Sequence, residues 1–356
     1  MKEWMKAAEK VVREPGVVMI LGAPSSGKTT FATFLANHCL EAGHRTAVVD
    51  ADVGQSDIGP PCTIGLGFPD APVERMREIP LAAGYFVGST SPDGHLHYMV
   101  AGVRRMVDKA LSLGATVVLI DTTGTVSGRF GRELKTAKFD AVRPRYLVGL
   151  EKEGEVEHLL KPLGSSADCC VVRLPVSPRA KPRSREERRQ ARERAYARYL
   201  QPGREVVLGL GDVTFHRGFL GTGRRLTHES LKEISSLLGE EVVHAEVIAE
   251  GLYVVGRWVR VPDPGKLVEA YGTREAVLVR EASFADILVG LADACGELLG
   301  VGILRGIDFA AGKARLWLPV ACGDPGRIRG MIMGSIRLTP EGRELGWVRA
   351  SERSLL

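Results

Sequence analysis

The chain has 356 residues, a net charge of +5 at pH 7 and 44% hydrophobic residues, which is typical of a globular protein with room for two domains. Its start is rich in charge, and no apolar run approaches the roughly 18 residues of a membrane span. The six cysteines form no C-x-x-C pair and no metal-ligand spacing with histidine. We therefore expect a cytoplasmic protein without a secretory leader or a membrane segment.

The first recognisable motif is a phosphate-binding loop, because residues 22–30 match the pattern G-x-x-x-x-G-K-[ST]. The apolar run Val17–Leu21 before it predicts a buried strand, and the pattern of Thr30–Leu40 after it predicts a helix closed by Gly43. A loop in this context directs backbone N–H groups and the positive end of a helix toward a phosphate. The expected nucleotide-binding residues are Gly22, Ala23, Pro24, Ser25, Ser26, Gly27, Lys28, Thr29 and Thr30. Among them, Lys28 should reach the β- and γ-phosphates and the Thr29 hydroxyl should bind Mg²⁺.

Apolar runs that end in polar residues continue along the first part of the chain and alternate with helical patterns. They predict strands at Thr46–Asp50, Thr116–Asp121, Arg145–Leu150 and Cys169–Leu174, and helices at Leu96–Leu113 and Glu153–Leu160. This alternation indicates an α/β fold, a P-loop NTPase whose parallel sheet is flanked by helices.

After about residue 201 the apolar runs become short and are separated by Gly or Pro, as in a mostly-β domain. The runs are Glu205–Leu210, Glu246–Glu250, Leu252–Val261, Ala276–Arg280 and Ala314–Val320. One amphipathic helix interrupts them, with Leu231, Ile234, Leu237 and Leu238 on one face and Gly239 as its C-cap. We predict a P-loop domain over residues 1–200 and a smaller mostly-β domain over residues 201–356.

Acidic residues follow two of the predicted strands. Asp50 and Asp52 lie two residues apart, so an extended chain would point both side chains the same way. At the carboxyl end of a parallel strand, such a carboxylate can orient Mg²⁺ or accept a proton from an attacking hydroxyl. The alternative is that Asp50 caps the loop that follows it.

The second acidic element is Asp121, which ends an apolar strand and is followed by Thr122, Thr123 and Gly124. Its Asp-x-x-Gly spacing also resembles a GTPase switch motif. A GTPase needs a guanine-reading [NT]-K-x-D motif at the end of a later strand. The nearest match, Ala137–Asp140, has Ala where Asn or Thr is required, and it follows Gly124 too closely in the sequence. We interpret that match as chance.

A concentrated basic segment lies between Arg179 and Leu200, with nine Arg or Lys residues and three Glu. Ser184 and Glu187 have the spacing of a capping box, which fixes the start of a helix. Its apolar residues, Ala191, Ala195, Tyr196, Tyr199 and Leu200, are confined to the far half. One end should therefore dock while the arginine-rich end projects, as in a lid that brings arginines onto transferring phosphates. A solvated basic helix is the alternative.

Together these motifs resemble the polynucleotide 5′-hydroxyl kinase family, the RNA kinases of tRNA splicing, mRNA 3′-end formation and rRNA processing. The resemblance spans most of the chain and is closest to the compact archaeal or bacterial members. The features that carry it are the loop 22–30, the string 50–55 followed by Pro60 and Pro61, the segments 88–92 and 121–124, the basic segment 183–188, and the C-terminal string 334–338.

The resemblance implies an enzyme that transfers the γ-phosphate of ATP, or of another NTP, to the 5′-OH end of RNA, with DNA left open as an acceptor. It implies that Lys28, Asp52, Arg183 and Arg188 are catalytic, with Asp52 as the general base and the two arginines closing over the phosphates. Gln55, Thr122, Thr123 and Gly124 would bind the acceptor end. Thr29, Asp52 and Asp121 would form the Mg²⁺ site. Thr125 stands where eukaryotic members often have an aromatic residue, so stacking of the acceptor base there is not expected.

Two other functions stay open at this point. One is a switch GTPase or metallochaperone-type NTPase, which Asp121 and Gly124 favour and the missing guanine motif opposes. The other is a nucleotide-bound scaffold of RNA processing without catalysis, which the complete set of Lys28, Thr29, Asp52, Arg183 and Arg188 opposes. The sequence identifies no protein partner.

Overall fold

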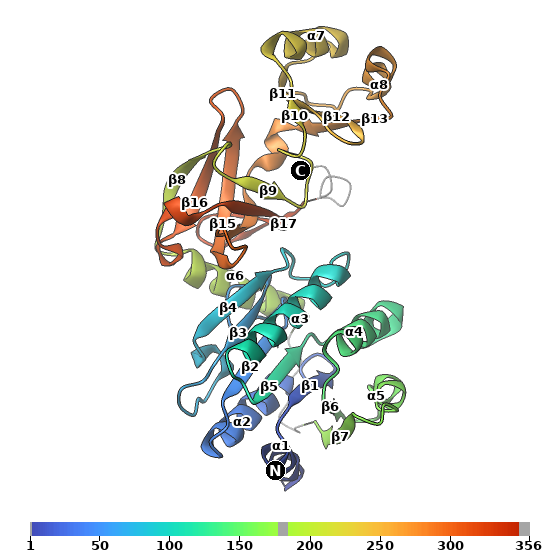
Figure 1. Ribbon diagram of the computed structural model, residues 1–356, viewed down its shortest axis with the longest axis vertical. Helices are drawn as coiled ribbons and strands as arrows, with labels where there is room; N and C mark the ends of the chain where they lie inside the picture. Colours follow the sequence, from blue (N-terminus) through green and yellow to red (C-terminus); the bar gives the residue numbers. More distant parts are fainter. Residues whose placement is uncertain (1, 177–183, 349–356) are drawn as a thin grey trace. The chain divides into compact units, whose positions relative to one another are not determined.

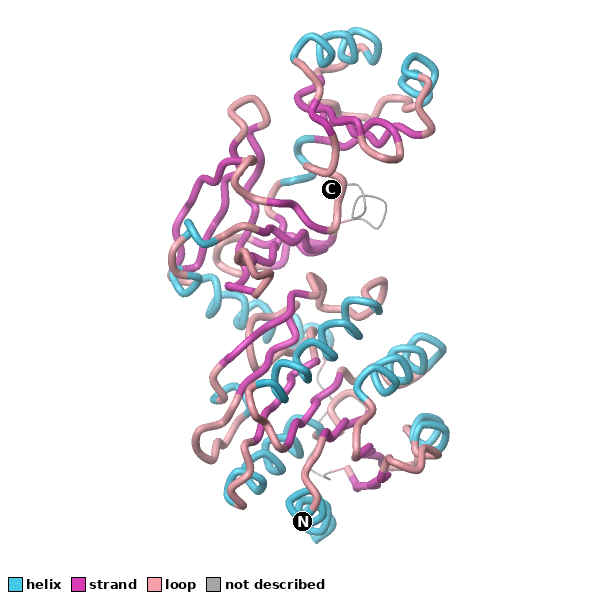
Figure 2. The backbone as a smooth tube through the Cα atoms, viewed as in Figure 1, coloured by secondary structure: helices cyan, strands magenta, loops and turns pink. Residues whose placement is uncertain are grey.

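The computed structural model describes residues 2–176 and 184–348 (Figures 1 and 2). The chain divides into two compact units, Met1–Arg192 and Glu193–Leu356, and the division falls inside helix α6 (Arg185–Leu200). Arg183, one of the two predicted lid arginines, lies outside the described residues. In the part of the chain that is described, no helix is long and apolar enough to cross a membrane.

The N-terminal unit is built on one seven-stranded sheet in the order β4-β3-β2-β5-β1-β6-β7. Its strands are β1 (Val17–Gly22), β2 (Thr46–Ala51), β3 (Thr63–Gly67), β4 (Leu81–Phe86), β5 (Val117–Thr122), β6 (Tyr146–Glu151) and β7 (Cys170–Pro175). Its helices before α6 are α1 (Lys2–Arg13), α2 (Lys28–Glu41), α3 (Leu96–Ser112), α4 (Gly128–Val142), α5 (Glu157–Leu163) and the 3-10 turn η1 (Met76–Glu78). Strands β2, β5, β1, β6 and β7 are parallel, which confirms the predicted α/β class.

Helices cover both faces of this sheet because alternate residues of each strand point to opposite sides. On β1, Val18 and Ile20 pack with α1 and α2, whereas Met19 and Leu21 pack on the side that carries α4 and α5. Helix α3 lies beside α4 on that second side (Figure 1). The central strands are therefore buried on both faces, as their continuous apolar sequences predict.

The sequence did not reveal the two strands that extend the parallel sheet at one edge. β3 pairs antiparallel with β2, and β4 pairs antiparallel with β3. β3 contains Gly65, where a Cβ atom would lie 1.9 Å from the carbonyl oxygen of Ile58. This close approach of two backbone segments requires glycine, and glycine weakens the sequence pattern of a strand. Helices α1 and α4 were also not predicted, and α5 begins four residues later than its pattern indicated.

The C-terminal unit contains two sheets, and its mostly-β character confirms the prediction. The larger is antiparallel along the order β18-β17-β14-β15-β16-β8, with β9 added parallel to β17. The smaller has the order β10-β11-β12-β13. The strands are β8 (Gly203–Gly209), β9 (Thr214–His216), β10 (Arg224–Arg225), β11 (Val242–Val247), β12 (Gly251–Gly256), β13 (Glu275–Arg280), β14 (Ile287–Ala292), β15 (Leu298–Asp308), β16 (Lys313–Pro319), β17 (Gly330–Leu338) and β18 (Glu344–Trp347). Short 3-10 turns follow at η2 (Glu281–Phe284), η3 (Val320–Cys322) and η4 (Pro325–Arg327).

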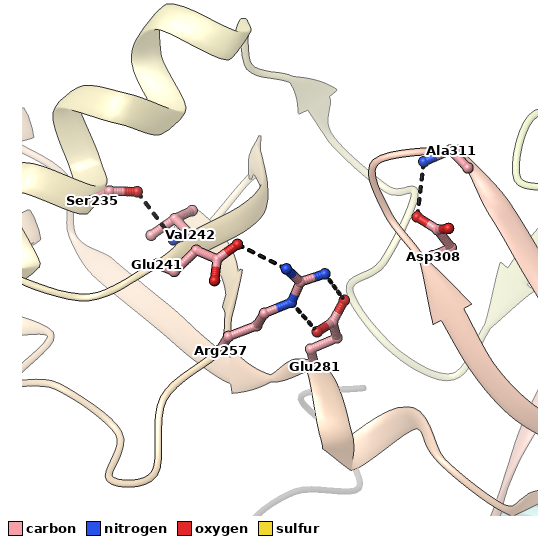
Figure 3. Close-up of polar contacts among 7 residues, drawn as sticks. All are labelled: Ser235, Glu241, Val242, Arg257, Glu281, Asp308 and Ala311. Atoms are coloured by element: carbon pink, nitrogen blue, oxygen red, sulfur yellow. Dashed lines mark hydrogen bonds and ion pairs between the residues drawn. The ribbon is translucent and has the colours of Figure 1, made fainter.

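The predicted amphipathic helix of this unit is α7 (His228–Leu238), and Gly239 caps it in the left-handed conformation with φ of 70°. Ile234 and Leu238 are buried, but Leu237 is 38% exposed, so it does not belong to the buried face. A second helix, α8 (Gly265–Tyr271), was not predicted. At the smaller sheet, Arg257 binds Glu281 through two nitrogens and Glu241 through a third (Figure 3). This ion-pair network joins the residue before β11, the residue after β12 and the first residue of η2.

Candidate active site

The phosphate-binding loop joins β1 to α2 as predicted. Strand β1 ends at Gly22, and Gly27 precedes α2 with φ of 91°, a conformation that favours glycine. Ser25 also has positive φ, at 62°. The Gly27 carbonyl accepts a hydrogen bond from the Phe31 N–H at 2.9 Å, and this bond closes the first turn of α2. The N–H groups at the start of a helix have no partner within it, so those of α2 face the loop.

Lys28 turns its ammonium group back onto this loop. Its Nζ donates to the carbonyl oxygens of Gly22 at 3.0 Å and Ala23 at 2.9 Å, and its side chain is 6% exposed. Burial lowers the pKa of Lys28, while the carboxylates of Asp121 and Asp52 oppose that shift. Phosphate oxygens are stronger acceptors than carbonyl oxygens because they are charged, so a bound nucleotide would compete for this ammonium.

Thr29, in the first turn of α2, and Asp121, near the end of β5, are in contact. The Thr29 hydroxyl donates to Asp121 Oδ2 at 2.6 Å, and Asp121 Oδ1 is buried without a hydrogen-bond partner among the described residues. Burial raises the pKa of Asp121 to about 6, against the opposing effects of Lys28 and Thr29. The pair thus offers two hard oxygen ligands, one of them uncommitted.

These residues fit Mg²⁺, which proteins usually hold with one or two carboxylates while the substrate phosphates and water supply the other ligands. Within residues 2–176 and 184–348, no group of three His, Cys, Asp or Glu side chains could hold a metal by itself. The orphaned oxygen of Asp121 is the observation that favours a cation at this position.

The loop after β2 separates the roles of Asp50 and Asp52. Asp50 is buried, and its carboxylate accepts the N–H groups of Asp57 at 2.6 Å, Ile58 at 2.9 Å and Asp52 at 3.1 Å. Asp50 therefore caps the loop, which confirms the alternative interpretation of this residue. Asp52 lies beyond the strand end and is only half-buried.

Asp52 is the less committed of the two carboxylates. Its Oδ1 accepts one N–H, from Gly54 at 3.2 Å, and the described residues give its other oxygen no hydrogen bond. The next loop lies close by, because a Cβ on Gly54 would be 2.8 Å from the carbonyl oxygen of Thr90. The segments 50–55 and 88–92 are thus adjacent in space.

The start of α6 also contacts this loop. The capping box is present, with Ser184 N donating to Glu187 at 2.6 Å and Glu187 N donating to the Ser184 hydroxyl at 3.1 Å. The Gln55 amide donates to the backbone carbonyl of Arg188 at 3.2 Å. The first turn of the basic helix therefore lies beside the Asp52 loop. In the far half of α6, Ala195, Tyr196 and Leu200 are buried, as predicted.

Residues Thr122–Gly124 are held from two sides. The Thr122 hydroxyl donates to the Ile20 carbonyl at 2.7 Å. A Cβ on Gly124 would lie 2.8 Å from the N and Cα atoms of Pro24, so glycine is required where this segment meets the phosphate loop. The Thr122 side chain is fully buried and its hydroxyl is engaged in hydrogen bonds.

Two buried lysines of α4 were not predicted as part of this region. Lys135 and Lys138 are each 0% exposed, and Lys135 donates to both Thr122 and Thr123. The stretch Ala137–Asp140 is inside this helix, so it forms no base-reading loop. Lys135 and Lys138 are three residues apart and share a helix face with Leu134 and Phe139. This spacing was the signal in the sequence that could have indicated their burial.

A phosphate loop with a lysine, a hydroxyl and a buried carboxylate at the carboxyl ends of parallel strands defines a P-loop nucleotide-binding protein. The family model of the mRNA cleavage and polyadenylation factor CLP1 P-loop matches residues 22–202. A polyribonucleotide 5′-hydroxyl-kinase of Thermococcus kodakarensis is 36% identical over 339 residues, which cover 95% of this chain and 93% of that protein. One of Methanocaldococcus jannaschii is 32% identical over 334 residues, 94% of this chain and 90% of that protein.

The fold has a counterpart among solved structures. Clp1p, in a wild-type complex with Pcf11p, has a TM-score of 0.59 to this chain, covers 95% of it with 79% of its own length, and is 14% identical. The relatives found by sequence define the protein family more narrowly than the similarity in fold to Clp1p does. The chain belongs to the polyribonucleotide 5′-hydroxyl-kinase family, which shares the CLP1 P-loop domain.

Proposed function

We propose that this protein transfers the γ-phosphate of ATP, or of another NTP, to the 5′-hydroxyl end of RNA, and we include DNA ends among the acceptors to be tested. The observation that carries the proposal is Asp52, a half-buried carboxylate with a single N–H contact, next to a complete phosphate site. The names of the archaeal relatives support the same acceptor class.

The donor nucleotide would bind the loop 22–30, with Lys28 leaving its carbonyl contacts for the β- and γ-phosphates. Thr29 and Asp121 would hold Mg²⁺, and the carboxylate of Asp52 lies close enough to Lys28 to oppose the lowering of the pKa of that lysine. When bound, the metal would neutralise charge on the phosphates. One solved structure of Clp1p, which resembles this chain in fold, concerns a point mutant that has lost ATP.

The acceptor 5′-hydroxyl would lie between Asp52 and the segment Thr122–Gly124, with Gln55 nearby. The hydroxyl oxygen would attack the γ-phosphorus while the bond from that phosphorus to the β–γ bridging oxygen breaks, and the nucleoside diphosphate would leave. Asp52 would take the proton of the hydroxyl in this step, because its uncommitted oxygen is available to accept a hydrogen bond. The transition state of phosphoryl transfer is loose and in line, so most of the rate enhancement comes from positioning and charge neutralisation. We assign that neutralisation to Lys28, Arg183 and Arg188, together with the bound Mg²⁺.

The test measures transfer of labelled γ-phosphate to three matched oligonucleotides: a 5′-hydroxyl RNA, a 5′-hydroxyl DNA and a 5′-phosphate RNA. Each is assayed with ATP or GTP as the donor, and with Mg²⁺ or excess EDTA. We expect transfer to the 5′-hydroxyl RNA only when Mg²⁺ is present, and none to the 5′-phosphate control. Nucleotide hydrolysis that needs no RNA, with a preference for GTP, would instead indicate a switch NTPase. Tight nucleotide binding without transfer or hydrolysis would indicate a scaffold.

A further inference from the structure

Helix α4 buries two lysines on the face that packs toward the sheet. Lys135 and Lys138 are both 0% exposed and are surrounded on that face by Leu134, Phe139 and Val142. Burial of an ammonium group is unfavourable unless its donors are satisfied. Burial lowers the pKa of both lysines, to about 8 for Lys138. A helix that only needed to cover a sheet would have apolar residues at both positions.

The two lysines differ completely in their hydrogen bonds. Lys135 Nζ donates to Thr122 Oγ1 at 2.8 Å, to the Thr123 carbonyl at 2.6 Å and to Thr123 Oγ1 at 3.2 Å. An ammonium group has three donors, so all of them are used. Lys138 Nζ has no hydrogen-bond partner among the described residues.

All three acceptors of Lys135 belong to the two residues that follow Asp121. The Thr122 oxygen accepts a hydrogen bond from Lys135, and its own O–H donates to the Ile20 carbonyl. These contacts form one chain from α4 to β1. Gly124 is fixed at the other end by its contact with Pro24. The backbone of Thr123 and Gly124 is thus held between a buried ammonium and the phosphate loop.

We infer that Lys135 is a positioning residue that holds the acceptor-binding segment Thr122–Gly124 at the correct distance from the phosphate loop. The inference rests on the proposed function, since it gives that segment an acceptor to bind. It concerns a residue that touches neither the nucleotide nor the RNA, because its ammonium is fully enclosed. Displacement of a binding group by about 1 Å can cost about a hundredfold in rate, so its effect should appear in the use of RNA and not in nucleotide binding.

The test compares Lys135→Met with Lys138→Met in the full-length protein. Both substitutions remove one buried charge from the same helix face and keep a similar volume, but only the first removes hydrogen bonds. For Lys135→Met we expect kcat/KM for a 5′-hydroxyl RNA to fall about 10- to 100-fold, with an ATP dissociation constant within about threefold of wild type. For Lys138→Met we expect both quantities to stay within about threefold of wild type.

The outcomes separate this inference from the proposed function. If the wild type transfers phosphate and Lys135→Met keeps its kcat/KM for RNA, the positioning role is wrong and the kinase function stands. An equal loss in Lys138→Met would also overturn it, because the effect would then come from charge alone. Absence of transfer by the wild type would overturn the proposed function, and the role of Lys135 with it.

A second variant keeps the test decisive if Lys135→Met does not fold. Thr122→Val removes the hydroxyl that accepts from Lys135 and keeps a similar volume. We expect Thr122→Val to lower kcat/KM for RNA about 10-fold with ATP binding retained, while Lys138→Met again serves as the control. A wild-type kcat/KM for RNA in Thr122→Val would contradict the inference.

Discussion

Within the described residues, the C-terminal unit has one almost fully buried carboxylate, Glu246, and the N-terminal unit has two, Asp50 and Asp121. Glu246 and Asp121 differ most clearly in their hydrogen bonds. In the C-terminal unit, Glu246 is 3% exposed and accepts hydrogen bonds from Gly221 N, Gly223 N and His244 Nε2 at 2.7–2.9 Å. In the N-terminal unit, Asp121 is 1% exposed and accepts one hydrogen bond, from Thr29. Its second oxygen has no partner in the described ranges.

The pKa shifts follow from these contacts. Burial alone would raise the pKa of Glu246, but the hydrogen bonds from His244, Gly223 and Gly221 outweigh it and lower the pKa. Burial raises the pKa of Asp121 to about 6 because too few donors compensate it. A carboxylate that stabilises the fold has its acceptors filled, whereas one that awaits a cation is left partly unsatisfied. The comparison therefore favours a structural role for Glu246 and supports the proposed metal-binding role of Asp121.

The largest effect is expected on the functional side of this comparison, at Arg188. Arg188→Ala should lower kcat for RNA phosphorylation by about 10³-fold or more, because an arginine on the transferring phosphate acts mainly in the transition state. RNA binding should change by less than about threefold. Single-turnover transfer and RNA titration measure the two quantities, and Arg129→Ala, which removes an exposed partner of Glu133, is the control. Near-normal turnover of Arg188→Ala would show that the lid assignment is wrong.

Substitution of Asp121 should separate activity from stability. Asp121→Asn is expected to lower transfer by about 10²- to 10³-fold, and to stabilise the ligand-free protein at pH 7.5 by about 1–3 kcal/mol. The sign follows from the raised pKa, because the folded carboxyl is protonated below about pH 6 whereas the unfolded one stays ionised down to its ordinary value of 3.8. The cost of the buried charge is therefore complete above about pH 6 and absent below 3.8. The stabilisation should therefore disappear as the pH approaches 4. Thermal unfolding over this pH range measures it, and a destabilised variant at pH 7.5 would contradict the comparison.

The opposite result is expected at Glu246. Glu246→Gln should leave phosphate transfer unchanged and destabilise the C-terminal unit by about 1–3 kcal/mol at pH 7, since an amide cannot accept from all three donors. The folded pKa of Glu246 lies below the ordinary value of 4.5. Its stabilising contribution is thus present above pH 4.5 and is lost as the pH falls through the folded pKa. The gap in unfolding free energy between wild type and variant should narrow below pH 4.5, and a gap independent of pH would argue against this role.

Local sequence was sufficient for the parts of the site that depend on neighbouring residues. The phosphate loop, the strand that carries Asp121 and the capping box of Ser184 and Glu187 were all predicted, because each is specified by a few adjacent positions. The division of roles between Asp50 and Asp52 was left open. It depends on β2 ending at Ala51 and on the N–H groups of residues 57 and 58 folding back onto Asp50.

The missed features depend on contacts between distant parts of the chain. Lys135 and Lys138 resemble surface residues in sequence, and their burial follows from how α4 packs on the sheet. Strand β3 was missed because Gly65 is required by the approach of Ile58, a contact that no pattern within the strand records. Physical chemistry predicts that a buried lysine or a close backbone contact is unfavourable, but only the fold shows which residues are in such positions.

The central claim is that Asp52 is the general base of a 5′-hydroxyl kinase. The most direct measurement is transfer of labelled γ-phosphate from ATP to a 5′-hydroxyl RNA by the wild type and by Asp52→Ala, with ATP binding measured for both. We predict transfer by the wild type, none by Asp52→Ala, and ATP binding by both proteins. Transfer by Asp52→Ala at the wild-type rate, or no transfer by the wild type with any nucleotide, would contradict the claim.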